Sequence, residues 1–569
     1  MRETSYFGYN ASDDLYRIQV NYAETGISFP KRMNNTNENL IGEWPYVGTP
    51  LSASQIHLMA VDSNSGAIFG LDKSMSDTII SFNAHIQTDL SSYTSTVDMI
   101  LMPSSKNITP SVIAGGTLMQ DTTWSGHLHV TGDIVIPDGI RLDILPGTQI
   151  MFASFSDDQN AGNYTDRVEL IAQNGSQLVM QGTLEDPILM TSDLIPSAGG
   201  EWGGIFIHFD MASQSIAISN CTIQGAINGI TIEQSGGYAT AQLSEINVFQ
   251  NANNGIYVHV HSGSHLSLDI FSHSAWVYAR NNGYHGIYAY VEHDQSVLDM
   301  TAQKLWVENN GQNGILCHGN NKARINYSFS NNMALGHNSA AGWDKGCGIS
   351  IYDASNAVVN GRLDNNTVMF NHHGMYRYTN NCYSDMTSNI LYANTAQYNI
   401  STGLKYYQYR GTGVLLRFEN NQVRNTTSGD GINVYRRYRQ TELPLIVELS
   451  NNLASQNADQ GISVEWNNSI DIQVSARDNR CENNGSDGIF VQAYQPSTFI
   501  NNHCQNNQGN GFKLFGNELT IKKQYRTKQW SYWFLDSKCQ FCPIYFKYCI
   551  KQPDQWHLSG YCFNRLLVI

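Results

Sequence analysis

The segment Asn251-Ala-Asn-Asn-Gly-Ile-Tyr-Val-His259 is one of a series of similar stretches that recur along the chain. Each stretch centres on a glycine that is followed by an aliphatic residue, a methionine or a phenylalanine. These repeat glycines follow one another at intervals of 23 to 34 residues: Gly229, Gly255, Gly286, Gly314, Gly348, Gly374, Gly403, Gly431, Gly461, Gly488 and Gly511. A period of this length, with no helical pattern in between, is typical of a solenoid in which each repeat is one turn of a coil.

The residues around each repeat glycine keep a fixed phase. Apolar side chains stand one and three residues after it, as Ile256 and Val258 do after Gly255, and both face inward if the segment is a strand. Four residues before the glycine, seven repeats carry an asparagine: Asn251, Asn282, Asn310, Asn399, Asn457, Asn484 and Asn507. Asparagine suits tight turns, and identical amides one strand spacing apart can bond to one another as a ladder.

Each interval has room for three short strands. Between Gly255 and Gly286, the segments 256–260, 265–271 and 275–278 alternate or cluster as strands separated by polar corners. We therefore predict an all-β fold, a right-handed parallel β-helix with three strands per rung, over residues 113–520. Upstream, the segments 55–61, 78–87 and 96–103 also alternate as strands, and we predict a small β-sandwich-like unit, with a truncated start, over residues 1–112.

Further motifs precede the repeats. They are His127-Leu-His-Val-Thr-Gly-Asp-Ile-Val-Ile-Pro-Asp-Gly-Ile-Arg-Leu-Asp-Ile-Leu-Pro-Gly-Thr-Gln-Ile-Met-Phe152, Gly182-Thr-Leu-Glu-Asp-Pro-Ile-Leu-Met-Thr-Ser192 and Glu201-Trp-Gly-Gly-Ile205. With the Asn-x-x-x-Gly-Ile corners, they resemble the right-handed parallel β-helix repeat proteins of the pectin-lyase-like superfamily, over residues 113 to 516. The resemblance implies the fold but no single function, because this fold hosts lyases, hydrolases, epimerases, adhesins and phage tail proteins.

The composition of the chain argues against some classes of binding partner. The 569-residue chain has a net charge of −15 and only 14% charged residues, which argues against a nucleic-acid partner. The apolar runs are of strand length, so we expect no membrane span. Residues 1–6 do not begin a signal peptide. Because the family that the chain resembles is overwhelmingly exported, we expect an extracellular or cell-surface protein.

A column of aromatic residues stands four residues after successive repeat glycines, at an outward position: His259, Tyr290, His318, Tyr352, Tyr378, Tyr407 and Tyr435. At strand spacing they would form a continuous strip suited to a sugar or a protein partner. The alternative is that tyrosine is simply a good strand former whose neighbours stabilise one another. As ligand-binding candidates we name Tyr352, Tyr378, Tyr407, Tyr435 and Arg436.

Arg436 belongs to a basic cluster beside this column, with Arg377, Lys405, Arg410, Arg437 and Arg439. Arg377 falls in the inward column, where a charge needs a partner. Two interpretations stay open. A bulge turns Arg377 outward, which we prefer, or a carboxylate such as Asp353 or Asp385 holds it at the rim or inside.

Known catalytic motifs of the family are missing. Asn-Thr-Asp and Asp-Pro-His-Glu do not occur, and Arg324-Ile-Asn326 and His372-His-Gly374 only partly match the motifs of polygalacturonate hydrolases. We interpret His372 and His373 as corner residues. The weak catalytic candidates are Arg377, Asp353, His372 and Arg410. We name no metal ligand and expect no cofactor, with calcium the one ion kept open, because lyases of this fold use calcium-binding acids.

Two groups stand out among the ten cysteines of the chain. Cys481 and Cys504 share an inward column on adjacent rungs, and we expect reduced core thiols. In residues 521–569 the repeat stops and Cys539, Cys542, Cys549 and Cys562 appear. A zinc site, a cap for the coil end and an out-of-frame sequence are the alternatives for this tail, and we prefer the last.

Two hypotheses for function remain. The first is a non-catalytic surface or adhesion protein whose long face binds a carbohydrate or another surface partner. The second is a polysaccharide lyase or glycoside hydrolase that acts on a uronate-containing polymer near residues 344 to 437. Clustered acids facing Arg377 or Arg410 would favour the enzyme, and an aromatic face poor in carboxylates would favour binding.

Overall fold

A computed structural model describes residues 110–527, apart from 185, 195–196, 198, 211–213, 274–275, 338–344, 383–386, 412, 439–443, 467–470 and 517. Outside this range only short backbone strands are assigned: β1 (Thr4–Ser5), β2 (Leu15–Tyr16), β3 (Ile18–Tyr22), β4 (Met33–Asn34), β5 (Ile56–Val61), β6 (Ile68–Phe69), β7 (Ile80–His85), β8 (Thr96–Leu101), β55 (Trp533–Phe534), β56 (Ile544–Tyr545) and β57 (Leu567–Val568). Strands β5, β7 and β8 fall on the three segments predicted before residue 104. The β-sandwich-like packing and the alternatives for the tail stay predictions.

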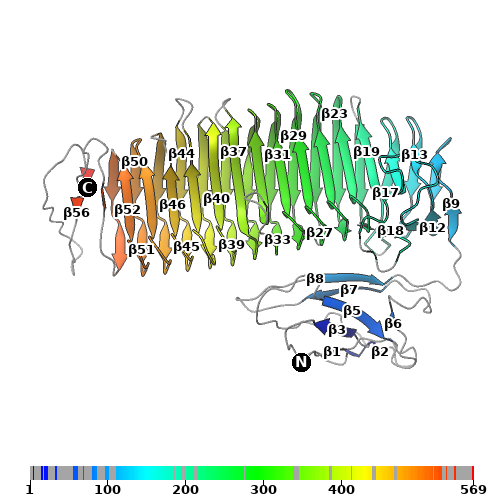
Figure 1. The fold of residues 1–569 in the computed structure, drawn as a ribbon, viewed down its shortest axis with the longest axis horizontal. Coiled ribbons are helices and arrows are strands. Elements are labelled where there is room, and N and C mark those ends of the chain that lie inside the picture. The colour runs from blue at the N-terminus through cyan, green and yellow to red at the C-terminus, as the bar shows by residue number, and fades with distance from the viewer. Residues whose placement is uncertain are drawn as a thin grey trace.

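Three parallel sheets run the length of the described coil, and each turn of the chain adds one strand to every sheet (Figure 1). The first sheet holds the strands that follow the repeat glycines and their upstream counterparts: β10 (Gly116–Thr117), β13 (Ile134–Ile136), β16 (Glu169–Ala172), β19 (Gly204–Phe209), β22 (Ile230–Gln234), β25 (Ile256–Val260), β28 (Ile287–Val291), β31 (Ile315–Gly319), β34 (Cys347–Ala354), β37 (His373–Cys382), β40 (Leu404–Gly411), β43 (Ile432–Arg436), β46 (Ile462–Trp466), β49 (Ile489–Ala493) and β52 (Phe512–Gly516).

The second sheet takes the next strand of each turn: β11 (Thr122–Trp124), β14 (Arg141–Ile144), β17 (Gln177–Gln181), β20 (Gln214–Ser219), β23 (Tyr238–Ser244), β26 (His265–Phe271), β29 (Val297–Gln303), β32 (Arg324–Ser330), β35 (Val358–Asp364), β38 (Thr387–Tyr392), β41 (Val414–Glu419), β44 (Leu445–Ser450), β47 (Ile472–Arg477), β50 (Ser497–Ile500) and β53 (Leu519–Lys522), which pairs with β57.

The third sheet completes each turn: β9 (Ser111–Ile113), β12 (His127–Val130), β15 (Gln149–Phe152), β18 (Ile188–Ser192), β21 (Cys221–Gln224), β24 (Asn247–Phe249), β27 (Val277–Arg280), β30 (Leu305–Glu308), β33 (Met333–Leu335), β36 (Thr367–Met369), β39 (Thr395–Gln397), β42 (Gln422–Arg424), β45 (Leu453–Ser455), β48 (Arg480–Glu482), β51 (His503–Gln505) and β54 (Tyr525–Thr527). The chain is therefore the predicted right-handed parallel β-helix with three strands per rung.

The core lies inside the coil and follows the predicted alternation. Ile256 and Val258 are fully buried, and each pairs with its counterpart in the next rung, Ile256 with Ile287 and Val258 with Ala289. The repeat glycines are required by close packing between rungs. A Cβ on Gly255 would lie 2.7 Å from the carbonyl oxygen of Gly286, so any larger residue there would push adjacent rungs apart.

The predicted asparagine ladder is present and buried. The Asn251 Nδ2 donates to Asn282 Oδ1 and the Asn282 Nδ2 to Asn310 Oδ1, both at 2.9 Å. His337 replaces asparagine in the next rung, where it bridges Asn310 and Asn371. Each ladder residue thus satisfies buried polar groups of the neighbouring corner.

A second ladder, which we did not predict, lies at the corner between the second and third sheets. Its amides bond in sequence at 2.9 to 3.1 Å: Asn332, Asn366, Asn394, Asn421, Asn452, Asn479 and Asn502. At both corners the left-handed conformation falls on the residue just before the ladder asparagine. Asn331 and Asn281, for example, have φ of 55°.

Two smaller points concern the cysteines and the membrane. Cys481 and Cys504 pair in register on β48 and β51, and both are buried free thiols, as expected. The described residues contain no helix with the length and apolarity needed to cross a membrane.

Candidate functional site

The outer face of the first sheet carries the predicted aromatic column (His259, Tyr290, His318, Tyr352, Tyr378, Tyr407 and Tyr435). Strand pairing aligns these residues one above another from β25 to β43. Ring centroids of successive members lie 4.3 to 5.4 Å apart. The alternation of strand side chains, together with in-register pairing, produces this stack.

The tyrosine rings of the column cover one another's faces. Interplanar angles are 1° between Tyr352 and Tyr378, 8° between Tyr378 and Tyr407, and 17° between Tyr407 and Tyr435. Only 8% of Tyr378 is exposed, and burial, followed by the neighbouring tyrosines, raises the pKa of its hydroxyl. A sugar ring therefore has no free face of Tyr378 or Tyr407 to lie on. This corrects the form of binding that we expected, because the packed column offers ring edges and hydroxyls instead of ring faces.

Arg377 and Asp353 do not reach the outer face. Arg377 Nη2 donates to Asp353 Oδ2 at 2.9 Å, Nη1 donates to the other carboxylate oxygen, and both residues are buried. Burial tends to lower the pKa of Arg377, but the charge of Asp353 raises it above its ordinary value. The preferred outward bulge was wrong, and the interior ion pair with Asp353 is confirmed; Asp385 lies outside the described residues. Neither residue can meet a polymer on the surface, which corrects their choice as catalytic candidates.

The position of Arg436 corrects its choice as a ligand-binding candidate. It stands five residues after Gly431, an inward position, and is fully buried. Its Nη2 donates to the carbonyl oxygen of Gly411 at 3.2 Å, and its Nη1 lies 3.5 Å from Asp471 Oδ2. Strand alternation places the guanidinium inside the coil, so Arg436 cannot contact a ligand on the outer face. Arg437 occupies the outward position beside it.

A patch of two arginines and two tyrosines, Tyr409, Arg410, Arg437 and Tyr438, lies where β40 and β43 end. We call it the arginine–tyrosine patch. Each guanidinium lies 5.2 to 5.4 Å from both ring centroids, and the rings meet edge to face at 5.3 Å. A register shift between β37 and β40 after Thr379 inserts Tyr409 as an extra residue. Residue Arg410, predicted as a candidate from sequence, thus belongs to an outer-face cluster.

Among the residues that the structure describes, no carboxylate neutralises the positive charge of the patch. Within the described residues, neither Arg410 nor Arg437 has an acidic side chain at ion-pair distance. A hydrogen bond to Tyr407 is the main cause that raises the pKa of Arg437, so this residue also connects the patch to the aromatic column. Arginine presents a planar fork of donors that matches carboxylates and sulfates.

His372 occupies the corner before β37, in agreement with its interpretation as a corner residue. Its ring centroid lies 4.7 Å from that of His373, and its backbone nitrogen donates to the carbonyl oxygen of His337 at 2.7 Å. Burial lowers the pKa of its imidazole, with a smaller contribution from Lys405. No described acid is paired with this ring, and its catalytic role stays an untested prediction.

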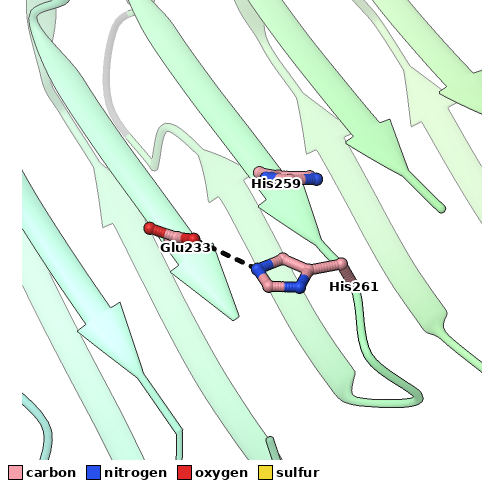
Figure 2. A group of neighbouring side chains, drawn as sticks. All are labelled: Glu233, His259 and His261. Carbon is pink, nitrogen blue, oxygen red and sulfur yellow. Dashed lines mark hydrogen bonds and ion pairs between the residues drawn. The ribbon is translucent and has the colours of Figure 1, made fainter. Parts of the chain in front are cut away.

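Three side chains that could hold a metal ion lie at the N-terminal end of the aromatic column, and the sequence did not lead us to predict them. Glu233, His259 and His261 offer ligand atoms that all lie within 4.8 Å of one another (Figure 2). We call them the histidine cluster. Glu233 stands four residues after Gly229, in the same column position as His259, so the column could have been followed one rung further upstream.

Comparison with known proteins agrees with this architecture. Residues 116–213 match the model of the pectate-lyase like beta helix domain, and residues 408–525 match that of the right handed beta helix region. The coil is therefore a right-handed parallel β-helix that contains a pectate-lyase-like β-helix domain at its start and a right-handed β-helix region at its end. No curated protein sequence matches it.

Three solved structures show a remote likeness. A mutant of the periplasmic alginate epimerase AlgG is 13% identical, with a TM-score of 0.32, over 57% of this chain and 75% of that one. The A-module of the mannuronan C-5 epimerase AlgE6 from Azotobacter vinelandii is 11% identical, with a TM-score of 0.30, over 68% and 91%. A mannuronic acid specific family 6 polysaccharide lyase from the human gut microbiota is 10% identical, with a TM-score of 0.22, over 67% and 82%.

Proposed function

We propose that this protein binds an acidic polysaccharide, one that carries uronate carboxylates, along the outer face of its first sheet, and that it does so without cleaving it. The observation that carries the proposal is the arginine–tyrosine patch. Arg410 and Arg437 are held in place by two rings and have no acidic partner among the described residues, on a chain with a net charge of −15. Arginines without an acidic partner in the described part of such a chain are suited to an anionic ligand.

The aromatic column supports the same ligand class. Its rings are packed against one another, so a ligand on this face would meet ring edges and hydroxyls rather than ring faces. In-register strands repeat these hydroxyls at about 4.8 Å per rung. A regular row of hydroxyl groups can exchange hydrogen bonds with the hydroxyls of a polymer, while the arginines select for carboxylates. Because polysaccharides of this kind lie outside cells, the proposal includes an extracellular or cell-surface location.

Calcium is not needed at the patch, because the arginines supply positive charge directly. Binding should therefore persist in the presence of a chelator. A fall in affinity on chelation would instead show that calcium bridges the polymer and the protein.

The alternative is a polysaccharide lyase acting on the same polymer, for which Arg437 would supply positive charge beside the phenol of Tyr407. In such a reaction the arginine would neutralise the uronate carboxylate, a base would take the proton from the adjacent carbon, and the departing glycosidic oxygen would receive a proton. Glycoside hydrolysis needs two carboxylates flanking the bond, and the patch itself contains none.

The test measures the affinity of the full chain for polymannuronate, polygalacturonate and a neutral polymer such as xylan. Replacing both arginines, Arg410→Gln with Arg437→Gln, should weaken uronate binding at least tenfold. Arg417→Gln is the matched control, because this half-exposed arginine lies on the second sheet and pairs with Glu448 at 2.6 Å. Equal affinity of the double variant would contradict the proposal, and ultraviolet-absorbing unsaturated products would establish the lyase.

A further inference from the structure

We propose that Glu233, His259 and His261 form a site for one zinc ion on the outer face of the first sheet. The site stands apart from the arginine–tyrosine patch, at the other end of the aromatic column, and the inference does not depend on the proposed polysaccharide ligand.

Local geometry brings the three side chains together. Glu233 in β22 and His259 in β25 are direct partners in the parallel ladder. His261 follows β25 two residues after His259, so strand alternation directs both imidazoles to the same face. Figure 2 shows Glu233 and His261 pointing toward each other, with His259 beside them on the adjacent strand. Strand pairing fixes Glu233 and His259, and His261 stands directly after the end of β25, where its backbone nitrogen donates to the carbonyl oxygen of Gln234 at 2.9 Å.

The distances approach those of a zinc site. His261 Nε2 lies 3.1 Å from Glu233 Oε1, and the ring centroids of His259 and His261 are 4.5 Å apart. Zinc bonds of 2.0 to 2.1 Å in a tetrahedron place neighbouring ligand atoms about 3.3 Å apart. One edge of the tetrahedron is thus already present. The third ligand atom lies within 4.8 Å, so a rotation of a side chain completes the set without moving the backbone.

The surroundings supply the outer partners that metal-bound histidines need. Glu292 Oε1 lies 3.0 Å from His259 Nε2, and Glu292 Oε2 accepts a hydrogen bond from the Tyr290 hydroxyl at 2.9 Å. His261 Nδ1 lies 2.8 Å from the Ser262 hydroxyl. A carboxylate or hydroxyl on the second nitrogen orients an imidazole toward a metal. Glu292 is therefore a positioning residue for His259.

Charge favours a cation at this place. Among the described residues, the basic partners of Glu233 and Glu292 are histidines alone, with no lysine or arginine within ion-pair distance. Two carboxylates thus lie beside two imidazoles that bind metal in their neutral form. Nitrogen ligands favour zinc over calcium or magnesium, which prefer oxygen. Three protein ligands and side chains that are 19 to 31% exposed leave a coordination position open to solvent.

The competing interpretation is a pair of ordinary surface hydrogen bonds, His259 with Glu292 and His261 with Glu233. The chain offers a matched example of such a pair, since His265 on the second sheet lies 2.7 Å from Asp299 and has no third ligand among the described residues. His265→Gln is therefore the control variant, and Glu233→Gln, His259→Gln and His261→Gln are the test variants.

The experiment titrates Zn²⁺ into the metal-free full chain and measures affinity and stoichiometry by calorimetry. Co²⁺ then reports the donor atoms through its visible spectrum. We expect one zinc ion to bind per chain. Its affinity should fall roughly 100-fold or more in each test variant and stay unchanged in His265→Gln. Glu292→Gln should weaken it less, by about tenfold. Cobalt should show ligand-field bands without thiolate charge transfer, which separates this site from the cysteines.

Zinc binding that all three test variants retain at full affinity would overturn the proposal, as would a cobalt spectrum with thiolate bands only. Circular dichroism of each variant guards against unfolding as the cause of a loss. Because the three side chains face outward and Glu233→Gln is isosteric, a folded variant without zinc is the expected outcome. Polysaccharide affinity is a separate readout that bears on the proposed function, whereas the zinc affinity of the three variants decides the present proposal.

Discussion

Arg377 and Asp353 form a two-pronged ion pair inside the coil, between strands β37 and β34 of the first sheet. Around them the interior is polar as well as apolar. The Tyr327 hydroxyl donates to Asn389 Oδ1 at 2.7 Å, and the same oxygen lies 3.4 Å from Arg377 Nε. A cavity of about 10 Å³ beside these residues has room for one water molecule. The middle of the solenoid is thus held by a buried hydrogen-bond network.

Breaking this ion pair should destabilise the protein strongly. Arg377→Met leaves the Asp353 carboxylate buried without its main partner, and we expect a loss of about 3 to 5 kcal/mol in the free energy of unfolding. Urea denaturation followed by circular dichroism measures the change. The exposed pair of Arg417 and Glu448 provides the control, because Arg417→Gln should cost less than about 1 kcal/mol. Similar losses for the two variants would show that burial does not make the interior ion pair more important for stability than the exposed one.

Removing both charges should restore part of that stability. In the double variant Arg377→Met with Asp353→Leu no unpaired charge remains buried, so its loss should be smaller than that of Arg377→Met alone. The measurement is a double-mutant cycle on the same urea curves. Additive losses would mean that the two side chains act independently, and this result would contradict the prediction.

The second asparagine ladder should be more sensitive than exposed asparagines. Asn366 donates through Nδ2 to Asn394 Oδ1 and to the carbonyl oxygen of Phe329, both at 3.0 Å, and accepts from Asn332. Asn366→Ala leaves buried polar groups unpaired, at about 1 to 3 kcal/mol each. The exposed Asn326, which bonds Asp299 at 2.7 Å, is the control. Thermal unfolding of Asn366→Ala and Asn326→Ala compares them, and equal midpoints would contradict the assignment.

Truncation of the aromatic column at Tyr378 should lower stability more than it lowers affinity. The ring is buried between Tyr352 and Tyr407, so Tyr378→Ala should cost about 3 kcal/mol through a lost packing contact. Tyr378→Phe keeps the ring and should be nearly as stable as the parent protein. Unfolding midpoints and polysaccharide affinity are measured on the same samples. A fully stable Tyr378→Ala variant that no longer binds would show that the ring itself contacts the ligand.

The first rungs should become less stable as pH rises toward neutrality. Burial, partly opposed by hydrogen bonds from Tyr164 and Asn163, raises the pKa of Glu169 from 4.5 to about 7. The folded state therefore holds a proton that the unfolded state releases near pH 4.5. The stabilisation is complete below about pH 4.5 and is lost as pH rises through 7, on the order of 3 kcal/mol. Glu169→Gln should flatten the pH dependence of the unfolding free energy between pH 5 and 8. An unchanged slope would contradict this prediction.

Sequence periodicity was sufficient to predict the coil and its two faces. The interval between repeat glycines defined the rungs, and alternation along each strand placed Ile256 and Val258 inside and His259 outside. The alternation rule is local, since it depends on the backbone geometry of one strand. The glycine recurs because adjacent rungs pack closely at the same corner of every turn. The first asparagine ladder followed because its members keep a constant distance of four residues from the glycine.

The second ladder was missed although part of it keeps a phase in the sequence. Asn394, Asn452, Asn479 and Asn502 each stand nine residues before a repeat glycine. The distance is eight residues for Asn366, ten for Asn421 and sixteen for Asn332, so the pattern is less regular over the whole ladder. Parallel pairing between rungs nevertheless brings the amides into line, since each strand aligns with the one beneath it whatever the length of the connection.

The sequence by itself thus determined which side chains share a face, and the tertiary structure alone decided what each one meets. The contrast is clearest in Arg377 and Arg436, whose inward positions could be counted but whose partners, Asp353 and Asp471, come from other turns of the coil. The histidine cluster likewise joins Glu233 to residues one full turn away. The physical reason is that a strand fixes side-chain direction by its own geometry, whereas a contact requires the register between rungs.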